Sequence, residues 1–212
     1  GDWSSDVCSS DLFVKRYSLS EEELSELVEY CKEVGIDFSS TPYSENEVDF
    51  LVENTIAPFI KIASMELNNL AFLKYIGSKG VPVILSTGMG TFEEIEQAVS
   101  TLEESGNNQI VILHCISIYP AEPEITNLRN ITKLKERFPE YVIGFSDHSI
   151  GPELAAASIA IGSSVIEKHF TLDQSKIGMD NQMAMETEGF EEMVKYCHRV
   201  SNSLGSYDRV LT

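Results

Sequence analysis

Short apolar segments alternate with helical patterns along most of the chain, and this alternation constrains the fold more than any other feature. Strands that alternate with helices are typical of βα units and a parallel sheet. Six candidate strands begin at intervals of 22 to 32 residues, a spacing typical of a (β/α)8 barrel. We therefore predict an α/β protein with a (β/α)8 TIM barrel, truncated to about six of its eight βα units. The candidate strands are IDFSSTPYS at 36–44, FIKIAS at 59–64, VPVILST at 81–87, QIVILHCIS at 109–117, YVIGFSDHS at 141–149 and SVIEKHFT at 164–171.

Helical patterns fill the intervals between these strands, and one precedes them. In that first helix Ser20 is the predicted N-cap, with Glu23 three positions later, and Gly35 is the predicted C-terminal stop. A doubly wound open sheet is the alternative architecture, but no GxGxxG motif follows a candidate strand. The other helical patterns lie at 49–54, 71–80, 91–106, 127–139, 151–162 and 188–205.

The first twelve residues, GDWSSDVCSSDL, differ in composition from the rest of the chain and hold its one tryptophan. Residues 2–12 resemble the in-frame translation of a sequencing-library adapter, and such segments are excluded from fold reasoning. We therefore expect residues 1–12 to be a non-native, disordered tail and residues 13–212 to form the partial barrel domain. A gene broken before Phe13 would explain why only six of the eight strands of a (β/α)8 barrel are expected, with the first two missing.

The balance of charge restricts the class of partner. The chain carries 34 Asp and Glu against 15 Lys and Arg, a formal net charge of −19. This excess of acid argues against sequence-independent nucleic-acid binding and against attraction to an anionic membrane. The apolar runs are far shorter than the roughly 20 residues that span a bilayer. The 4 scattered cysteines, without a CxxC pair, are not typical of a disulfide framework. We expect a cytoplasmic protein with no nucleic-acid and no membrane partner.

Each candidate strand ends in polar residues, which is where a parallel barrel gathers its reacting groups. Side chains two positions apart share one face of a strand. We therefore expect three such pairs to point together into the mouth of the barrel. The pairs are Ser146 with His148, Glu167 with His169, and Ser117 with Tyr119.

Two histidines end consecutive strands, and this arrangement suits a metal site. Neutral imidazoles at His148 and His169 can jointly bind a divalent ion. The alternative is that hydrogen bonds inside the barrel satisfy both rings. Asp147 and Glu167 stand near them and can orient imidazoles or hold a polar substrate. His114, within a strand, is expected to be a core or supporting histidine.

Lys61 interrupts the apolar run FIKIAS. A lysine that faces the barrel lumen needs an anion to pair with, so Lys61 is a candidate anchor for phosphate or carboxylate. The alternative is an edge lysine whose ammonium reaches solvent. Glu66 and Asp180 could bind hydroxyls or transfer protons, or they could be solvated loop carboxylates. Hydroxyls around the same mouth could bind phosphate oxygens, or cap strand ends, at Thr41, Ser64, Ser86, Thr87 and Ser146.

Together these groups suit the binding of a small phosphorylated anion beside a polyhydroxylated partner. Several sequence segments that carry these groups resemble the N-acetylneuraminate (sialic acid) synthase family, which includes the legionaminate and pseudaminate synthases. The resemblance runs in order from about residue 18 to residue 204. Its strings are FSSTPYS, KIASMELNN, VPVILSTGMG, LHCISIYPAEPEITNLRNI, IGFSDHSIG and VIEKHFTLD. HCxSxYP, GFSDH and EKHFTLD together are highly specific, whereas any one alone would be a weak signal.

The resemblance implies a barrel enzyme that condenses phosphoenolpyruvate with the open-chain aldehyde of an N-acylated hexosamine, of the N-acetylmannosamine type. Carbon 3 of phosphoenolpyruvate attacks the aldehyde carbon, water adds at carbon 2, and the tetrahedral intermediate expels phosphate. The product is a nine-carbon 2-keto sugar acid. The resemblance also implies a divalent metal, typically Mn2+, and a homodimeric parent protein.

The same resemblance implies roles for individual positions. The implied catalytic residues are Glu66, His148 and His169, and the two histidines are the implied metal ligands. The implied phosphoenolpyruvate-binding residues are Thr41, Lys61, Ser64, Ser117 and Ser146. The residues that would face the sugar or its aldehyde are Glu66, Tyr119, Glu167 and Asp180.

The chain also departs from the family pattern. Ser117 stands where some members have asparagine, and Asn181 stands where members often carry histidine. By this resemblance, we expect the chain to lack an active-site glutamate and lysine, which the first two family strands carry, and the C-terminal antifreeze-like domain. Two alternatives follow: an inactive fragment of such an enzyme, or another metal-dependent barrel enzyme, either a hydrolase or a phosphoenolpyruvate-utilising aldolase.

Overall fold

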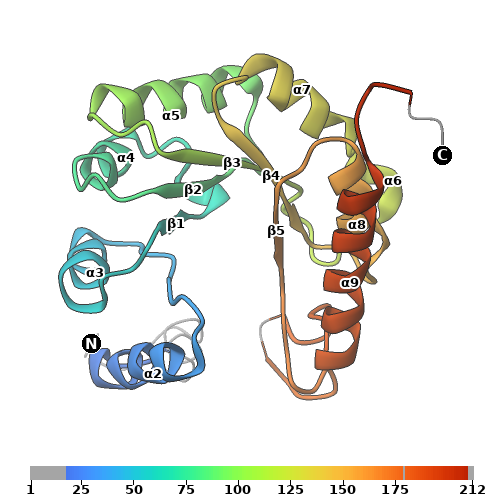
Figure 1. The fold of residues 1–212 in the computed structure, drawn as a ribbon. Coiled ribbons are helices and arrows are strands. Elements are labelled where there is room, and N and C mark those ends of the chain that lie inside the picture. The colour runs from blue at the N-terminus through green and yellow to red at the C-terminus, as the bar shows by residue number, and fades with distance from the viewer. Residues whose placement is uncertain (1–17, 179, 210–212) are drawn as a thin grey trace, which may run out of the picture.

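The computed structural model describes residues 18–178 and 180–209. These residues form a sheet of five parallel strands in the order β1-β2-β3-β4-β5. Figure 1 shows that the sheet curls like part of a barrel, with helices α4, α5 and α7 on its outer side. The predicted α/β class and parallel sheet are therefore confirmed. The strands are β1 (Ile60–Ile62), β2 (Val83–Ser86), β3 (Ile110–Cys115), β4 (Val142–Asp147) and β5 (Val165–Lys168). The predicted tail lies outside the described residues.

Helices connect the strands as the hydrophobic periodicity predicts. The predicted capping box at the first helix is confirmed, because the Glu23 N–H donates to Ser20 Oγ (3.2 Å) and the Ser20 N–H donates to Glu23 Oε2 (2.7 Å). Gly35 ends this helix with a φ of 73°, a conformation that glycine adopts without strain. The helices are α2 (Glu21–Val34), α3 (Glu45–Asp49), α4 (Leu70–Gly77), α5 (Phe92–Glu104), α6 (Pro123–Thr126), α7 (Arg129–Arg137), α8 (Glu153–Ala160) and α9 (Thr187–Ser203). A π-helix, η2 (Phe50–Thr55), follows α3, and a 3-10 turn, η3 (Ser64–Glu66), follows β1.

The predicted strand at 36–44 is wrong. Residues 36–42 form no strand ladder within the described part of the chain. Ser39 Oγ instead donates to the Phe59 carbonyl, at 2.6 Å. A side-chain hydrogen bond thus holds this segment near the start of β1 where a backbone ladder was expected. Polar residues after Phe38 leave few apolar side chains to pack on the sheet, and Ile36 is exposed.

The strands separate apolar from polar side chains by direction. Ile60 and Ile62 on β1 point outward into a core shared with α4, α5 and α7, whereas Lys61 points into the curl. The register then aligns inward-facing side chains across the sheet, with Cys115 opposite Ser146 and Ser146 opposite Glu167. This alternation places the polar groups of the inner face at the carboxyl ends of the strands and leaves the outer face mostly apolar.

His114 is buried on the outer face of β3, which confirms that it is a core histidine. Its Nε2 lies 2.7 Å from the Thr126 carbonyl oxygen, and its ring stacks on Phe145 at a centroid distance of 5.8 Å. Because a carbonyl oxygen only accepts, Nε2 carries the proton. Burial lowers the pKa of His114 below its ordinary value. The folded protein therefore prefers the neutral imidazole.

His114→Gln should make stability less dependent on pH. The unfolded chain protonates below about pH 6.5, before the folded chain does, so the contribution of His114 to stability is present above pH 6.5 and lost as the pH falls. One such group changes the unfolding free energy by at most about 1.4 kcal/mol per pH unit. Glutamine keeps a donor for Thr126 and cannot titrate. Urea unfolding at pH 7.0 and 5.5 measures the change.

The matched control for this variant is His198→Gln, because His198 lies exposed on α9. That substitution should leave the pH dependence of unfolding as it is in the parent chain. An identical loss of stability between pH 7.0 and 5.5 in the parent chain and in His114→Gln would contradict the assignment.

Candidate active site

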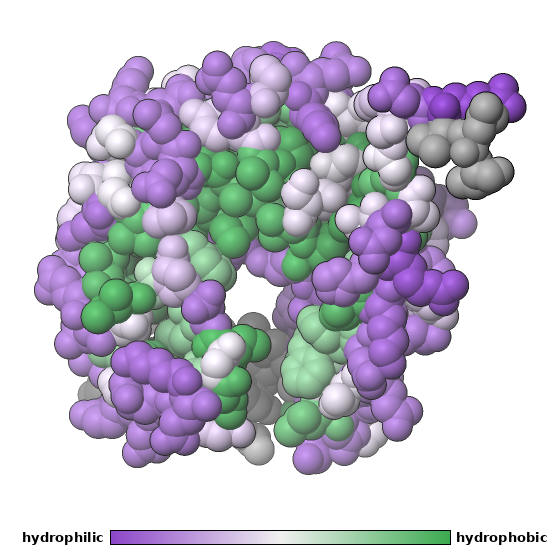
Figure 2. All heavy atoms as spheres, in the orientation of Figure 1, coloured by the Kyte–Doolittle hydropathy of each residue, from purple (hydrophilic) through white to green (hydrophobic). Residues whose placement is uncertain are grey.

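A pocket of about 630 Å³ opens at the carboxyl ends of the strands. Figure 2 shows that the molecule is hollowed through its centre, inside the curl of the sheet. Of the predicted site residues, all except Glu66 and Thr87 line this pocket. They are Thr41, Lys61, Ser64, Ser86, Ser117, Tyr119, Ser146, His148, Glu167, His169 and Asp180. Thr87 is buried, and its Oγ1 donates to the Leu113 carbonyl at 2.8 Å. The structure therefore brings together side chains that come from seven separate stretches of the sequence.

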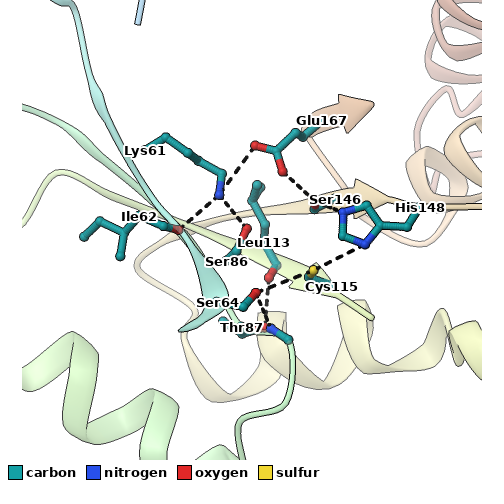
Figure 3. A network of polar contacts seen from close by, with 11 residues as sticks. Lys61, Ile62, Ser64, Ser86, Thr87, Leu113, Cys115, Ser146, His148 and Glu167 are labelled. Carbon is teal, nitrogen blue, oxygen red and sulfur yellow. Dashed lines mark hydrogen bonds and ion pairs between the residues drawn. The ribbon is translucent and has the colours of Figure 1, made fainter. Parts of the chain in front are cut away.

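Lys61 extends into the pocket and is held there by three groups (Figure 3). Its Nζ donates to Ser86 Oγ at 2.8 Å and to the Ile62 carbonyl at 3.0 Å, and it lies 3.5 Å from Glu167 Oε2. The side chain is only 13% exposed, so the alternative of an edge lysine that reaches solvent is wrong. The ammonium forms a fixed positive charge on the pocket wall.

His148 has one nitrogen committed and one facing the pocket. Nδ1 lies 2.7 Å from the Ile116 carbonyl oxygen, so Nδ1 carries the proton. Nε2 lies 3.2 Å from Ser146 Oγ, but the single Ser146 proton goes to Glu167 Oε1 at 2.6 Å. The lone pair on His148 Nε2 is therefore not consumed by the serine and is available to a cation or a donor.

His169 completes the pair of imidazoles. The two rings meet edge to face with centroids 5.3 Å apart, and the Tyr119 ring stands 4.2 Å from His148 and 5.7 Å from His169. Burial lowers the pKa of both histidines, and the charge of His148 lowers that of His169 further. His169 Nδ1 lies 3.6 Å from Asp180 Oδ2. Since His169 is neutral near pH 7, this contact is polar and is not an ion pair.

The donor chemistry fits a divalent ion that keeps open positions. Across residues 18–178 and 180–209, the structure has no group of three or more His, Cys, Asp or Glu side chains placed to hold a metal. Two neutral imidazoles, with the lone pair of His148 Nε2 available, are a partial donor set. A set of this kind leaves coordination positions for water or substrate.

Gly88 lies against the hydroxyl groups of Ser64 and Ser117, and we call this close arrangement the Gly88 cradle. Its N–H donates to Ser64 Oγ at 2.9 Å. A Cβ at this position would lie 2.2 Å from Ser117 Oγ and 2.9 Å from Ser64 Oγ. A side chain at this position would therefore displace the hydroxyls of Ser64 and Ser117. The GMG string after β2 is a weak signal for this contact by itself, because a short glycine string has many structural uses.

Glu66 lies beside the pocket and does not line it. It ends the turn η3, where its Oε2 accepts a hydrogen bond from Asn69 Nδ2 at 2.8 Å. Burial raises the pKa of Tyr43, and the charge of Glu66 raises it further, so the carboxylate stands near Tyr43 at the rim. The catalytic role predicted for Glu66 stays a prediction.

Asp147, the neighbour of His148 in the sequence, does not line the pocket, so it is not placed to hold a substrate there. Asp147 points to the outer face and pairs with Lys168 at 2.9 Å. The period of two along a strand explains the difference, because neighbours in sequence point to opposite faces. The pocket lining also includes residues that were not predicted as site residues: Tyr43, Ala63, Met65, Met89, Cys115 and Lys168. For Cys115, inward register with Ser146 is the signal that could have found it.

Comparison with known proteins identifies the family. Residues 4–209 match the model of the NeuB family. The chain belongs to the NeuB family. The resemblance to the sialic acid synthases is thereby confirmed, and the chain is sialic acid synthase-like. No helix in the described part of this NeuB-family chain is long and apolar enough to cross a membrane.

Relatives agree with this assignment. The spore coat polysaccharide biosynthesis protein SpsE of Bacillus subtilis is 41% identical over 85% of this chain and 48% of its own length. The N,N'-diacetyllegionaminic acid synthase of Legionella pneumophila is 34% identical over 92% of this chain and 56% of its own. The solved structure of N-acetylneuraminic acid synthetase from Leptospira borgpetersenii, in complex with citrate, superposes with a TM-score of 0.92 at 31% identity, covering 98% of this chain and 72% of its own. The chain spans about half the length of the curated relatives that it matches.

Gly88→Ala should weaken anion binding in the pocket. The new methyl group would push against the hydroxyls of Ser64 and Ser117, and overpacking of this kind typically costs about 1–3 kcal/mol. We expect the Kd for inorganic phosphate, measured by NMR titration, to rise about tenfold or more. Gly189→Ala, within α9, is the control, because its Cβ would meet only the flexible Met185 side chain. Equal phosphate affinity in Gly88→Ala and the parent chain would contradict the cradle.

Proposed function

We propose that this NeuB-family chain carries the pocket of a phosphoenolpyruvate-dependent, sialic acid synthase-type transferase. The reaction joins phosphoenolpyruvate to an N-acylated hexosamine, such as N-acetylmannosamine, and yields a nine-carbon 2-keto sugar acid and phosphate. One observation carries the proposal: a buried lysine, several hydroxyls and two neutral imidazoles share one pocket wall. Family membership supports the same reaction class.

The anion side of the pocket suits phosphoenolpyruvate. Lys61 supplies a fixed positive charge, and hydroxyl donors at Ser64 and Ser117 surround the Gly88 cradle. Charge-assisted hydrogen bonds of this kind are stronger than neutral ones. A net charge of −19 repels an anion from the protein as a whole, so local positive charge is needed to hold one. Thr41 and Ser146 extend the same donor surface.

A divalent metal, which we propose to be Mn2+, would be held by His148 Nε2 and His169. When bound it supplies Lewis-acid polarisation of the sugar aldehyde oxygen. His148 is prepared for this role by its own contacts, because the Ile116 carbonyl fixes the proton on Nδ1 and leaves Nε2 as the ligand atom. Second contacts of this type commonly fix the tautomer of a metal-binding histidine.

The remaining residues bind and orient the sugar. The carboxylates of Glu167 and Asp180 accept hydrogen bonds from sugar hydroxyls at the pocket wall. Burial raises the pKa of Tyr119, so its phenol keeps its proton near pH 7 and can donate to the substrate. As carbon 3 of phosphoenolpyruvate bonds to the aldehyde carbon and water adds at carbon 2, Lys61 compensates the charge of the phosphate that leaves with the broken C–O bond.

Lys61→Met should abolish most of the affinity for phosphoenolpyruvate. The substitution keeps an unbranched side chain and removes the ammonium, and a hydrogen bond to a charged group contributes about 1.5–3 kcal/mol. We expect the Kd, measured by isothermal titration calorimetry, to rise about tenfold to a hundredfold. Lys79→Met is the matched control, because Lys79 pairs with Asp49 away from the pocket. Equal losses in both variants would show that Lys61 is not the anion anchor.

Phosphate release tests the reaction itself. We expect release of inorganic phosphate from phosphoenolpyruvate that depends on both Mn2+ and an N-acylated hexosamine, followed with a panel of such sugars. The sugar that gives the highest kcat/KM identifies the substrate. Binding of phosphoenolpyruvate without release in the presence of any of these sugars would favour the alternative of an inactive fragment.

A further inference from the structure

A buried ion pair lies at the end of the hydrogen-bonded ladder between β4 and β5, the two strands that precede the histidines. Asp147 and Lys168 are register partners at the last rung of β4 and β5, which lie side by side in Figure 1. Asp147 Oδ2 and Lys168 Nζ are 2.9 Å apart, and their side chains are 0% and 2% exposed. The next residue on each strand is His148 or His169. The ion pair therefore lies one residue before both imidazoles.

The same pair also holds the residue that follows His148. Lys168 Nζ donates to the Ser149 carbonyl, while Asp147 Oδ1 accepts from the Ser149 N–H at 2.9 Å and from Ser149 Oγ at 2.6 Å. Asp147 and Ser149, the residues on both sides of His148, thus both contact the buried ammonium of Lys168. On the pocket side, the Ile116 carbonyl holds the ring itself. These contacts leave His148 little freedom to move relative to β5.

We infer that Asp147 and Lys168 are positioning residues, which set the separation and orientation of the imidazoles of His148 and His169. This inference rests on the proposed metal site. Backbone hydrogen bonds fix the distance between β4 and β5 as far as the Asp147–Lys168 pair. The ion pair between these two side chains then holds the strands together next to His148 and His169, whose ring centroids are 5.3 Å apart.

The energetics of buried ion pairs allow positioning to be separated from stability. Removing one partner leaves an uncompensated buried charge, but replacing both by apolar residues of similar volume is often neutral for stability. An apolar pair cannot donate to the Ser149 carbonyl or accept from its N–H. Replacing both residues should therefore preserve the fold while releasing the His148 segment.

The experiment compares the double variant Asp147→Leu/Lys168→Met with the parent chain. We expect the melting temperature to stay within a few degrees and the Kd for Mn2+, measured by electron paramagnetic resonance of the free ion, to rise at least about tenfold. The matched control is Asp49→Leu/Lys79→Met, which removes an ion pair away from the pocket and should leave the Mn2+ affinity unchanged. Parent-like Mn2+ affinity in the folded Asp147/Lys168 double variant would overturn the inference.

A second readout does not need the metal. Long-range 1H–15N NMR of the metal-free chain reports the tautomer and surroundings of each imidazole, and we expect the His148 and His169 signals to shift in the double variant. Unshifted signals would also overturn the inference. If the parent chain binds no Mn2+, the proposed metal site fails, and these NMR signals still decide whether the ion pair positions the rings.

A further variant covers the case in which the double variant does not fold. Lys168→Arg keeps the charge but replaces a compact ammonium by a longer, planar guanidinium. We expect it to fold, to shift both imidazole signals and to raise the Kd for Mn2+ at least about threefold. A folded Lys168→Arg chain with parent-like imidazole signals and Mn2+ affinity would count against the inference in the same way.

Discussion

The alternation of side-chain direction along parallel strands is the constraint on which the rest of this structure depends. Successive residues point to opposite faces, and the register places each inward-facing residue beside another inward-facing residue on the next strand. The outer face then packs apolar side chains beneath the helices, while the inner face gathers polar groups at one end. A site assembled from Lys61, Ser146 and Glu167 follows from this geometry without any special loop.

Within that geometry, each hydroxyl group has one proton to donate, and this limits which hydrogen bonds the polar groups of the pocket can form. Ser146 has one proton and gives it to Glu167, so His148 Nε2 keeps its lone pair. The Glu167 carboxylate in turn stands 3.5 Å from Lys61 Nζ, which limits the desolvation cost of a half-buried acid and a buried base. The anion side and the imidazole side of the pocket are therefore coupled through one serine and one glutamate.

Much of this arrangement follows from the sequence pattern, and the exceptions have physical causes. The strand ends at Ser146, His148, Glu167 and His169 could be placed in one pocket because period-two alternation is a local rule. The segment at 36–44 could not be placed, because a strand requires a partner and its contact with Phe59 is made by the Ser39 hydroxyl. Alternation alone turns Asp147 to the outer face, but its pairing with Lys168 depends on cross-strand register, which alternation does not specify.

The outward ion pair and the inward imidazoles also restrict each other through register. A one-residue slip of β5 would turn the Lys168 side chain to the inner face of the sheet and His169 to the outer face, because a slip by one reverses every side chain. The slip would separate Lys168 from Asp147 and leave a fully buried carboxylate unpaired, which is strongly unfavourable. The buried charges thus oppose an error in strand pairing that would remove an imidazole from the pocket. A pair that contributes little net stability can in this way still specify which residues reach the site.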